Sequence, residues 1–214
     1  MKMNETLKRA LSGAVYVAIM WIGTSYSETS CRILFLILGL VSVYEMWKLR
    51  KGKSKLVAYL YVLLPFILIQ FLISDLQLKN VAFNSSLILF MFILTWTFDT
   101  FAYLFGVKFG KTKIMPSVSP KKSWEGFVGG FVFTLISAYI TATYFIEIDT
   151  QLAMGISIFL PFTATTGDFT ESYYKRKAGV KDSGNFMPGH GGMLDRMDAF
   201  MITIPVIYIL TNLL

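Results

Sequence analysis

Apolar segments long enough to cross a lipid bilayer recur along almost the whole chain, and they constrain its fold more than any other feature. A membrane-spanning α-helix needs about 20 mostly apolar residues, within a range of about 17–25. Judged by this length, the sequence predicts about seven spans, which cover Ala10–Tyr26, Arg32–Trp47, Leu56–Ser74, Val81–Phe98, Gly126–Ile146, Leu152–Thr166 and Met197–Leu214. We therefore expect an all-α, polytopic helical membrane protein.

The composition agrees with this class and argues against a soluble domain. Hydrophobic residues make up 55% of the 214 residues and charged residues only 15%, whereas soluble domains carry about 25% charged residues. The first residues resemble a signal peptide, but the regular spans that follow favour a retained first helix. Without repeats or linkers, the chain is expected to be one domain, 1–214, with plain spans in 1–98 and the two long polar loops in 99–214.

Lysine and arginine are distributed very unevenly between the two sets of loops. If the N-terminus is cytoplasmic, 18 of the 20 basic residues lie in cytoplasmic segments, and only Arg32 and Lys79 lie outside. Short cytoplasmic loops accumulate positive residues, so this distribution predicts a cytoplasmic N-terminus. The net charge of +7 then belongs to a face that attracts anionic headgroups and phosphates. No soluble basic module is present, so we expect no nucleic-acid partner.

Two long polar loops, residues 99–125 and 167–196, lie on the predicted cytoplasmic side. Long loops without repeats are often functional. The second loop and the residues just after it interleave cations with five carboxylates, those of Asp168, Glu171, Asp182, Asp195 and Asp198. Mg²⁺ binds carboxylates together with substrate phosphates, and lysine or arginine neutralises the remaining phosphate oxygens. This composition suits phosphoryl or nucleotidyl transfer, although a solvated loop of paired charges explains it equally well.

The span before the second loop is short for a membrane helix. Its 15 residues form about 22 Å of helix, against a hydrocarbon layer of about 30 Å. We therefore expect Asp168, Asp195 and Asp198 to lie at or below the lipid headgroups, at the cytoplasmic edge of the membrane. Acids at such depth are costly and tend to be functional. If the last helix begins near Asp195, Asp195 and Asp198 share one of its faces.

The first loop closes in the sequence SPKKSWEG, Ser119–Gly126. Lys121 and Lys122 stand in a Ser/Pro turn, where they could hold phosphates. Gly126 and Gly130 form a small-xxx-small pattern, which favours close helix packing. Packing within the chain is the preferred interpretation of this pattern, and a homodimer contact is the alternative.

The second loop closes in the sequence PGHGGMLDRMD, residues 188–198, which contains the only histidine. A structural, hydrogen-bonded role and a phosphate contact compete for His190, because the glycines around it leave backbone amides open. The chain lacks a G-x-x-x-x-G-K-[ST] phosphate loop and a Rossmann glycine fingerprint. One histidine and one cysteine also make a catalytic triad unexpected.

These motifs together resemble the phosphatidate cytidylyltransferase family, also called CDP-diacylglycerol synthase. The family signature reads approximately S-x-x-K-R-x4-K-D-x5-P-x-H-G-G-x-x-D-R-x-D, and every spacing is kept here from Ser172 to Asp198. The SPKKSWEG element and the G-D-x-x-E-S of Gly167–Ser172 resemble two further family elements. The resemblance covers residues 99–214. The chain is short for the family, so we expect it to lack N-terminal spans, and Thr170 and Tyr174 depart from the usual residue types.

The resemblance implies the reaction of CTP with phosphatidate of the inner leaflet, giving CDP-diacylglycerol and pyrophosphate at the cytoplasmic face of a bacterial inner membrane. It implies Mg²⁺ as cofactor, with two divalent ions expected and a monovalent cation as an alternative. Asp168 and Asp195 are the expected metal ligands, and the catalytic set adds Asp182, His190, Arg196 and Asp198. The expected substrate-binding residues are Asp99, Ser119, Lys121, Lys122, Lys175, Arg176, Lys181, Gly191 and Gly192.

Two other functions are compatible with the sequence. A cytidylyltransferase acting on another lipid phosphate, such as an ether or polyprenyl lipid, would carry the same polar residues. A membrane transporter is the non-enzymatic alternative, and it predicts charged residues in the middle of the spans. Almost all charged residues lie instead at the predicted cytoplasmic ends, which favours the enzyme.

Overall fold

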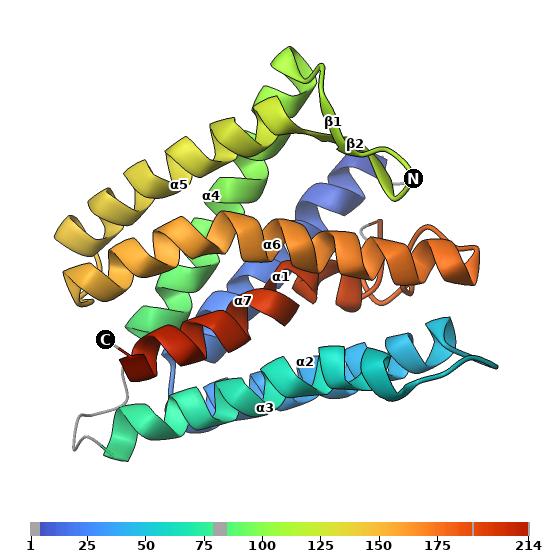
Figure 1. Ribbon diagram of the computed structural model, residues 1–214. Coiled ribbons are helices and arrows are strands. Elements are labelled where there is room, and N and C mark those ends of the chain that lie inside the picture. The colour runs from blue at the N-terminus through green and yellow to red at the C-terminus, as the bar shows by residue number, and fades with distance from the viewer. Residues whose placement is uncertain (1–4, 79–84, 190, 214) are drawn as a thin grey trace.

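In the computed structural model, the chain forms one helical bundle with a small hairpin at its edge (Figure 1). The structure describes residues 5–78, 85–189 and 191–213. Within these residues the helices are α1 (Glu5–Ser25), α2 (Glu28–Leu49), α3 (Leu56–Leu78), α4 (Ser86–Phe109), α5 (Trp124–Tyr144), α6 (Thr150–Ala178) and α7 (Leu194–Leu213). The strands are β1 (Lys113–Met115) and β2 (Ser119–Ser123), which pair antiparallel.

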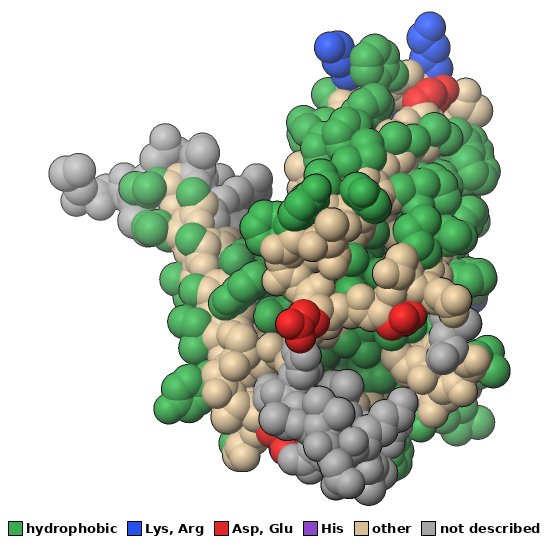
Figure 2. Space-filling model, turned by 90° about the vertical axis from the view of Figure 1, so that its left-hand side faces the viewer, with side chains coloured by type: hydrophobic (Ala, Val, Ile, Leu, Met, Phe, Trp, Pro, Cys, Tyr) green, Lys and Arg blue, Asp and Glu red, His purple; other side chains and the backbone are tan. Residues whose placement is uncertain are grey.

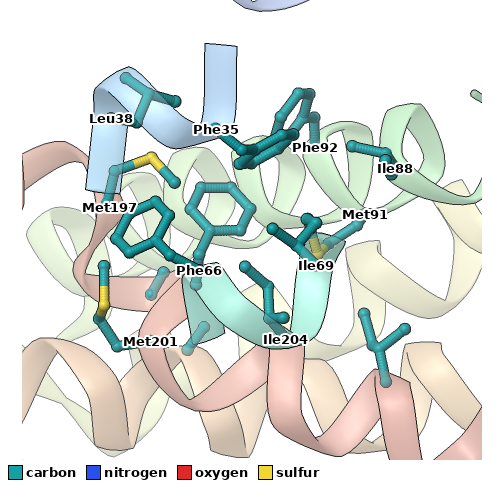
Figure 3. Close-up of a cluster of buried hydrophobic side chains, with 14 of the residues drawn as sticks. Phe35, Leu38, Phe66, Ile69, Ile88, Met91, Phe92, Met197, Met201 and Ile204 are labelled. Carbon is teal, nitrogen blue, oxygen red and sulfur yellow. The ribbon is translucent and has the colours of Figure 1, made fainter. Parts of the chain in front are cut away.

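Apolar side chains from four helices meet in the centre of the bundle (Figure 3). Phe92 of α4 is fully buried there, with its ring 6.2 Å from that of Phe35 on α2 and 5.4 Å from that of Phe200 on α7. Phe66 and Ile69 bring α3 into the same cluster. Large apolar side chains are exposed on the outer helix faces as well, and helices that are apolar all round are typical of a membrane interior.

Five helices in the described part of the chain are long and apolar enough to cross a membrane. They are α2, the Leu56–Ile73 part of α3, α4, α5 and α6. The prediction of a helical protein with several membrane-length segments is therefore confirmed. The total of seven spans stays a prediction, because α1 contains only a shorter apolar stretch, Ala10–Ser25, and α7 is not among the five.

Two helices extend beyond the predicted spans. α4 continues to Phe109, and α6 has 29 residues and continues to Ala178. Residues 99–109 and 167–178, which lie in the two predicted polar loops, are therefore helical, as the four-residue spacing of Phe101, Phe105 and Phe109 indicates for the first of them. The predicted short span before Asp168 is wrong. Polar side chains do not interrupt the backbone hydrogen bonds of a helix, so α6 can continue past its apolar part. Gly179 follows the last residue of α6, and its φ of 73° is the left-handed conformation that glycine adopts most easily.

The hairpin departs from the all-α expectation. β1 and β2 occupy most of the connection between α4 and α5, with Lys113 opposite Ser123 and Met115 opposite Ser119. The motif SPKK contributes the first four residues of β2. The lysines predicted to lie in a turn therefore lie on a strand, which holds their backbone in a fixed direction.

α4 and α5 pack very closely, and glycines make this possible. A Cβ atom on Gly126 would lie 2.6 Å from the carbonyl oxygen of Ala102, and one on Gly130 would lie 2.8 Å from the ring of Phe98. Such distances are shorter than van der Waals contact, so each position needs a residue without a side chain. The predicted packing within the chain at Gly126 and Gly130 is confirmed.

The two ends of the bundle differ in the segments that lie there. The hairpin, the α2–α3 connection and the C-terminal end of α6 lie at the same end, on the right in Figure 1. The start of α1 and the end of α7 lie at opposite ends. Figure 2 shows the other end, where the described surface carries apolar and acidic side chains and where Lys and Arg are seen only at the upper edge.

We predict that Gly126→Ala destabilises the protein although alanine favours a helix. The collision with Ala102 should cost about 1–3 kcal/mol, which exceeds the helix-propensity gain of up to about 1 kcal/mol. Thermal unfolding in detergent should show a lower midpoint for this variant. Gly23→Ala is the control, because its Cβ would meet only the end of the flexible Leu34 side chain, at 3.0 Å. Equal midpoints for Gly126→Ala and wild type would contradict the packing account.

Candidate functional site

The SPKKSWEG motif attaches the hairpin to the start of α5. The Ser123 hydroxyl caps this helix by accepting a hydrogen bond from the Gly126 amide at 3.2 Å. The Glu125 carboxylate accepts hydrogen bonds from the amides of Lys111 and Thr112, at 3.1 and 3.0 Å, on the other side of the hairpin. These contacts fix β2, and with it the following lysine pair, relative to α4 and α5.

A cavity of about 630 Å³ lies between α4, the hairpin, α5 and α6. Its polar lining includes the predicted residues Asp99, Ser119, Lys121, Lys122 and Asp168. The Lys122 ammonium forms an ion pair with the Asp168 carboxylate. Burial lowers the pKa of Lys122, while the negative charges of Asp198 and Asp99 act in the opposite direction. Apolar side chains from α4 and α5 also line it, so the cavity combines a charged part with an apolar part.

A second group of charges connects α6 to the start of α7. Lys175 is buried, and its ammonium lies 2.6 Å from Oδ1 of Asp195. It also forms an ion pair with Glu171, one turn earlier on α6, whose carboxylate is fully buried. Oδ2 of Asp195 accepts hydrogen bonds from the amides of Ser183 and Gly192, at 2.8 and 2.7 Å. Asp195 therefore joins α6, the connecting loop and α7.

The two groups are adjacent because α6 and α7 touch through their backbones. A Cβ atom on Gly167 would overlap the carbonyl oxygen of Asp198, so this contact requires glycine. It places Asp168 next to the first turns of α7, and it explains why a glycine precedes that aspartate. The charge of Asp198 in turn acts on Lys122, Lys175 and Arg196. The acids and bases of both groups thus share one electrostatic environment.

The loop between α6 and α7 forms a hollow of about 620 Å³. Its lining includes Lys181, Asp182, Gly191 and Arg196. The Nε atom of Arg196 is buried and has no hydrogen-bond partner in the described part of the chain. Gly191 has a φ of 89°, a left-handed conformation that other residues rarely adopt. The hollow therefore offers the positive charges of Lys181 and Arg196 to an anionic ligand.

The structure brings most predicted site residues into these three places. Arg176 is the exception, since it is exposed and its guanidinium donates to the carbonyl of Val180 at 3.0 Å. It closes the end of α6 and lines neither cavity. His190 lies outside the described residues. The catalytic and binding roles of all these residues stay predictions.

Glu45 on α2 contacts the start of α7 and the loop before it, although it is not among the predicted site residues. It is only 4% exposed. Its carboxylate accepts hydrogen bonds from the amides of Met193 and Leu194 and from the Ser183 hydroxyl, at 3.0, 2.8 and 2.8 Å. The available signal was an acid inside an apolar segment, which is costly to bury and therefore tends to have a specific role.

The carboxylates fit a metal only together with a phosphate ligand. Among the described residues, no three His, Cys, Asp or Glu side chains form a group that could hold a metal ion. Mg²⁺ is often bound by one or two carboxylates plus substrate phosphates. Asp168 and Asp195 each already face a cation, Lys122 and Lys175 respectively. A metal ion on Asp195 would have to replace the lysine at Oδ1. The metal ligands stay a prediction.

Comparison with known proteins agrees with this geometry. Residues 1–214 match the model of the cytidylyltransferase family. Proteins named phosphatidate cytidylyltransferase are similar, among them one from Thermotoga maritima that is 45% identical over 126 residues, 56% of this chain and 47% of that protein. One from Staphylococcus aureus is 44% identical over 125 residues, 58% of this chain and 48% of that protein. One from Rickettsia typhi is 34% identical over 209 residues, 94% of this chain and 89% of that protein. The chain spans about half the length of the first two relatives.

We predict that Lys175→Met destabilises the protein strongly, because it leaves the carboxylates of Glu171 and Asp195 without their cation. Removing one partner of a buried ion pair costs about 3–5 kcal/mol. Thermal unfolding in detergent should show this loss, and adding Glu171→Gln should recover part of it. Lys51→Met, at an exposed position, should unfold like wild type. A Lys175→Met variant as stable as wild type would show that the buried charges are compensated in another way.

Proposed function

The chain belongs to the cytidylyltransferase family, and we propose that it transfers CMP from CTP to phosphatidate, forming CDP-diacylglycerol and pyrophosphate. The names of the three relatives state this activity for those proteins. The observation that carries the proposal is the pairing of lysines with carboxylates, Lys122 with Asp168 and Lys175 with Asp195, where α6 and α7 meet. Such pairs place cations that can bind phosphate beside acids that can bind a metal ion.

The chemistry joins two anions, so neutralisation of charge and positioning dominate it. A phosphate oxygen of the lipid forms a bond to the α-phosphorus of CTP, and the bond from that phosphorus to the bridging oxygen of pyrophosphate breaks. Lys122, Lys175 and Arg196 would bind phosphate oxygens, since ammonium and guanidinium groups form strong charge-assisted hydrogen bonds with phosphate. No covalent enzyme intermediate is needed.

The two cavities suit the two substrates. The cavity at Lys122 and Asp168 has apolar walls as well as charges, which matches a lipid with a phosphate head. The hollow at Lys181 and Arg196 belongs to a polar loop, which matches the triphosphate of a water-soluble nucleotide. Asp195 and Asp198 lie in the first turns of α7, which begins just after the loop that forms the hollow.

Mg²⁺ is proposed as the cofactor, held by Asp168 and Asp195 once substrate phosphates complete the coordination. When bound, it would neutralise phosphate charge and make the α-phosphorus a better electrophile. Two divalent ions, or one divalent ion with a monovalent cation, are both compatible with the donors. Lys122 and Lys175 would then move from the carboxylates to phosphate oxygens.

We place the site at the cytoplasmic face of a bacterial inner membrane, with seven spans and a cytoplasmic N-terminus. The placement of 18 of the 20 basic residues on one side supports this orientation, as does the gathering of the hairpin and the α2–α3 connection at one end (Figure 1). A homodimer stays a further prediction for this protein. A transporter is not favoured, and another lipid phosphate is the alternative substrate.

We predict that the purified protein labels lipid from radioactive CTP when phosphatidate and Mg²⁺ are present. ATP, GTP and UTP should label it far less, because the family transfers a cytidylyl group. Ether-linked and polyprenyl phosphates, offered in place of phosphatidate, test the alternative acceptors. The measurement is labelled lipid resolved by thin-layer chromatography. No labelled lipid from any of the four nucleotides would reject the proposed function.

We also predict that Asp168→Asn raises the Mg²⁺ concentration needed for half-maximal activity. Loss of one carboxylate from a metal site of few protein ligands should shift this concentration at least about tenfold. The Mg²⁺ dependence of lipid labelling, titrated after treatment with a chelator, measures the shift. Asp149→Asn is the matched control, because this residue caps the opposite end of α6 and asparagine also caps helices. An unchanged Mg²⁺ dependence in Asp168→Asn would remove this residue from the metal site.

A further inference from the structure

Glu45 lies outside the region that carries the family motifs, and we infer that it is a positioning residue of the transferase site. The inference rests on the proposed function, since it gives Glu45 a part in that reaction. The residue lies near the C-terminal end of α2 and is buried. None of the residues predicted to bind substrate or metal lies in the N-terminal half, residues 1–98. Glu45 is therefore a direct link from that half to the catalytic part.

Both oxygens of the Glu45 carboxylate hold the start of α7. Oε1 accepts from the Met193 amide at 3.0 Å, and Oε2 accepts from the Leu194 amide at 2.8 Å. α7 begins at Leu194, and the first amides of a helix have no acceptor within the helix itself. A negative charge at this end also interacts favourably with the helix dipole. Glu45 thus caps α7 from a different helix.

The loop before α7 is shaped around this carboxylate. A Cβ atom on either Gly184 or Gly192 would overlap the carboxylate oxygens of Glu45. Both glycines therefore leave space that Glu45 fills, on opposite sides of its carboxylate. The amide of Gly192 also donates to Asp195 at 2.7 Å. The same turn consequently contacts the buried glutamate and the aspartate of the proposed site.

Ser183 couples the two carboxylates directly. Its hydroxyl oxygen lies 2.8 Å from Oε2 of Glu45 and 3.0 Å from Oδ2 of Asp195. A hydroxyl has one hydrogen to donate, so it can serve only one of these acceptors at a time. The other oxygen of Asp195 holds the Lys175 ammonium at 2.6 Å. A shift of Glu45 would therefore move Ser183 and Asp195, and through Asp195 it would also move Lys175.

This arrangement predicts an effect on turnover more than on substrate binding. Asp195, Arg196 and Asp198 all lie in the first turns of α7, so a shift of the helix start moves them together. A misplacement of about 1 Å far from the reacting atoms can cost about 100-fold in rate. Glu45 itself lines neither cavity, so its loss removes no direct contact with a substrate.

The test is steady-state kinetics of Glu45→Gln, which keeps the size of the side chain but removes the charge and one acceptor. We expect kcat to fall roughly 10- to 100-fold, while KM for CTP and for phosphatidate each change less than about threefold. Glu45→Asp, which keeps the charge, should recover part of the lost kcat. The matched control is Glu28→Gln, another acid of α2, which pairs with Arg32 within its own helix and should behave like wild type.

Hydrogen exchange gives a second readout that does not depend on activity. The amides of Met193 and Leu194 should exchange at least about tenfold faster in Glu45→Gln than in wild type or Glu28→Gln, because their acceptor is weakened. Unchanged exchange would show that Glu45 does not hold α7.

If Glu45→Gln does not fold, Ser183→Ala replaces it in the kinetic test. A smaller loss of kcat is then expected, because only the bridging hydroxyl is removed.

The outcomes separate the inference from the function on which it rests. Wild-type kcat in an otherwise folded Glu45→Gln, or in Ser183→Ala where that variant replaces it, overturns the inference alone. A loss confined to KM also overturns it, because Glu45 would then act in substrate binding. A wild-type protein that labels no lipid from any nucleotide overturns the proposed function, and the kinetic role of Glu45 with it. Faster exchange at Met193 and Leu194 would then still support the anchoring of α7.

Discussion

The ammonium of Lys175, held between the carboxylates of Glu171 and Asp195, is the interaction on which the rest of the site depends. All three groups are buried or nearly so, and a buried charge is tolerated only when it is paired and hydrogen-bonded. The lysine therefore fixes the distance between α6 and α7. The glycine at position 167 completes this constraint, because it lets the two backbones touch beside Asp168.

The apolar character of the bundle gives these charges their function. Helices long enough to cross a membrane carry few charged residues, and the paired lysines and acids of the proposed site lie where α6 meets the hairpin and α7. A lipid phosphate and a water-borne triphosphate can meet only where apolar and polar surroundings join. The cavity at Lys122 has both kinds of lining, and it lies beside the hairpin that α5 holds through Ser123 and Glu125. The architecture thus brings a lipid phosphate and a nucleoside triphosphate to the same acids and lysines.

The sequence predicted where each helix of the described part of the chain lies, because long apolar runs leave few alternatives. The family motifs marked most of the charged residues that line the two cavities. It missed the continuation of α6 past Asp168, since polar residues inside a helix resemble a loop when hydrophobicity alone is considered. It also missed the strands, because the fixed direction of SPKK depends on Glu125 binding amides 13 and 14 residues earlier. Glu45 could not be placed, because its main partner in α7 is 149 residues away.

The central claim is that the lysines at the α6–α7 junction bind the phosphates that react. An experimental structure of the protein with Mg²⁺ and a non-hydrolysable CTP analogue tests it most directly. The account predicts triphosphate oxygens within hydrogen-bonding distance of Lys122, Lys175 or Arg196, with at least one lysine moved away from its carboxylate. A nucleotide bound at the opposite end of the bundle, with both lysine–aspartate pairs intact, would contradict it.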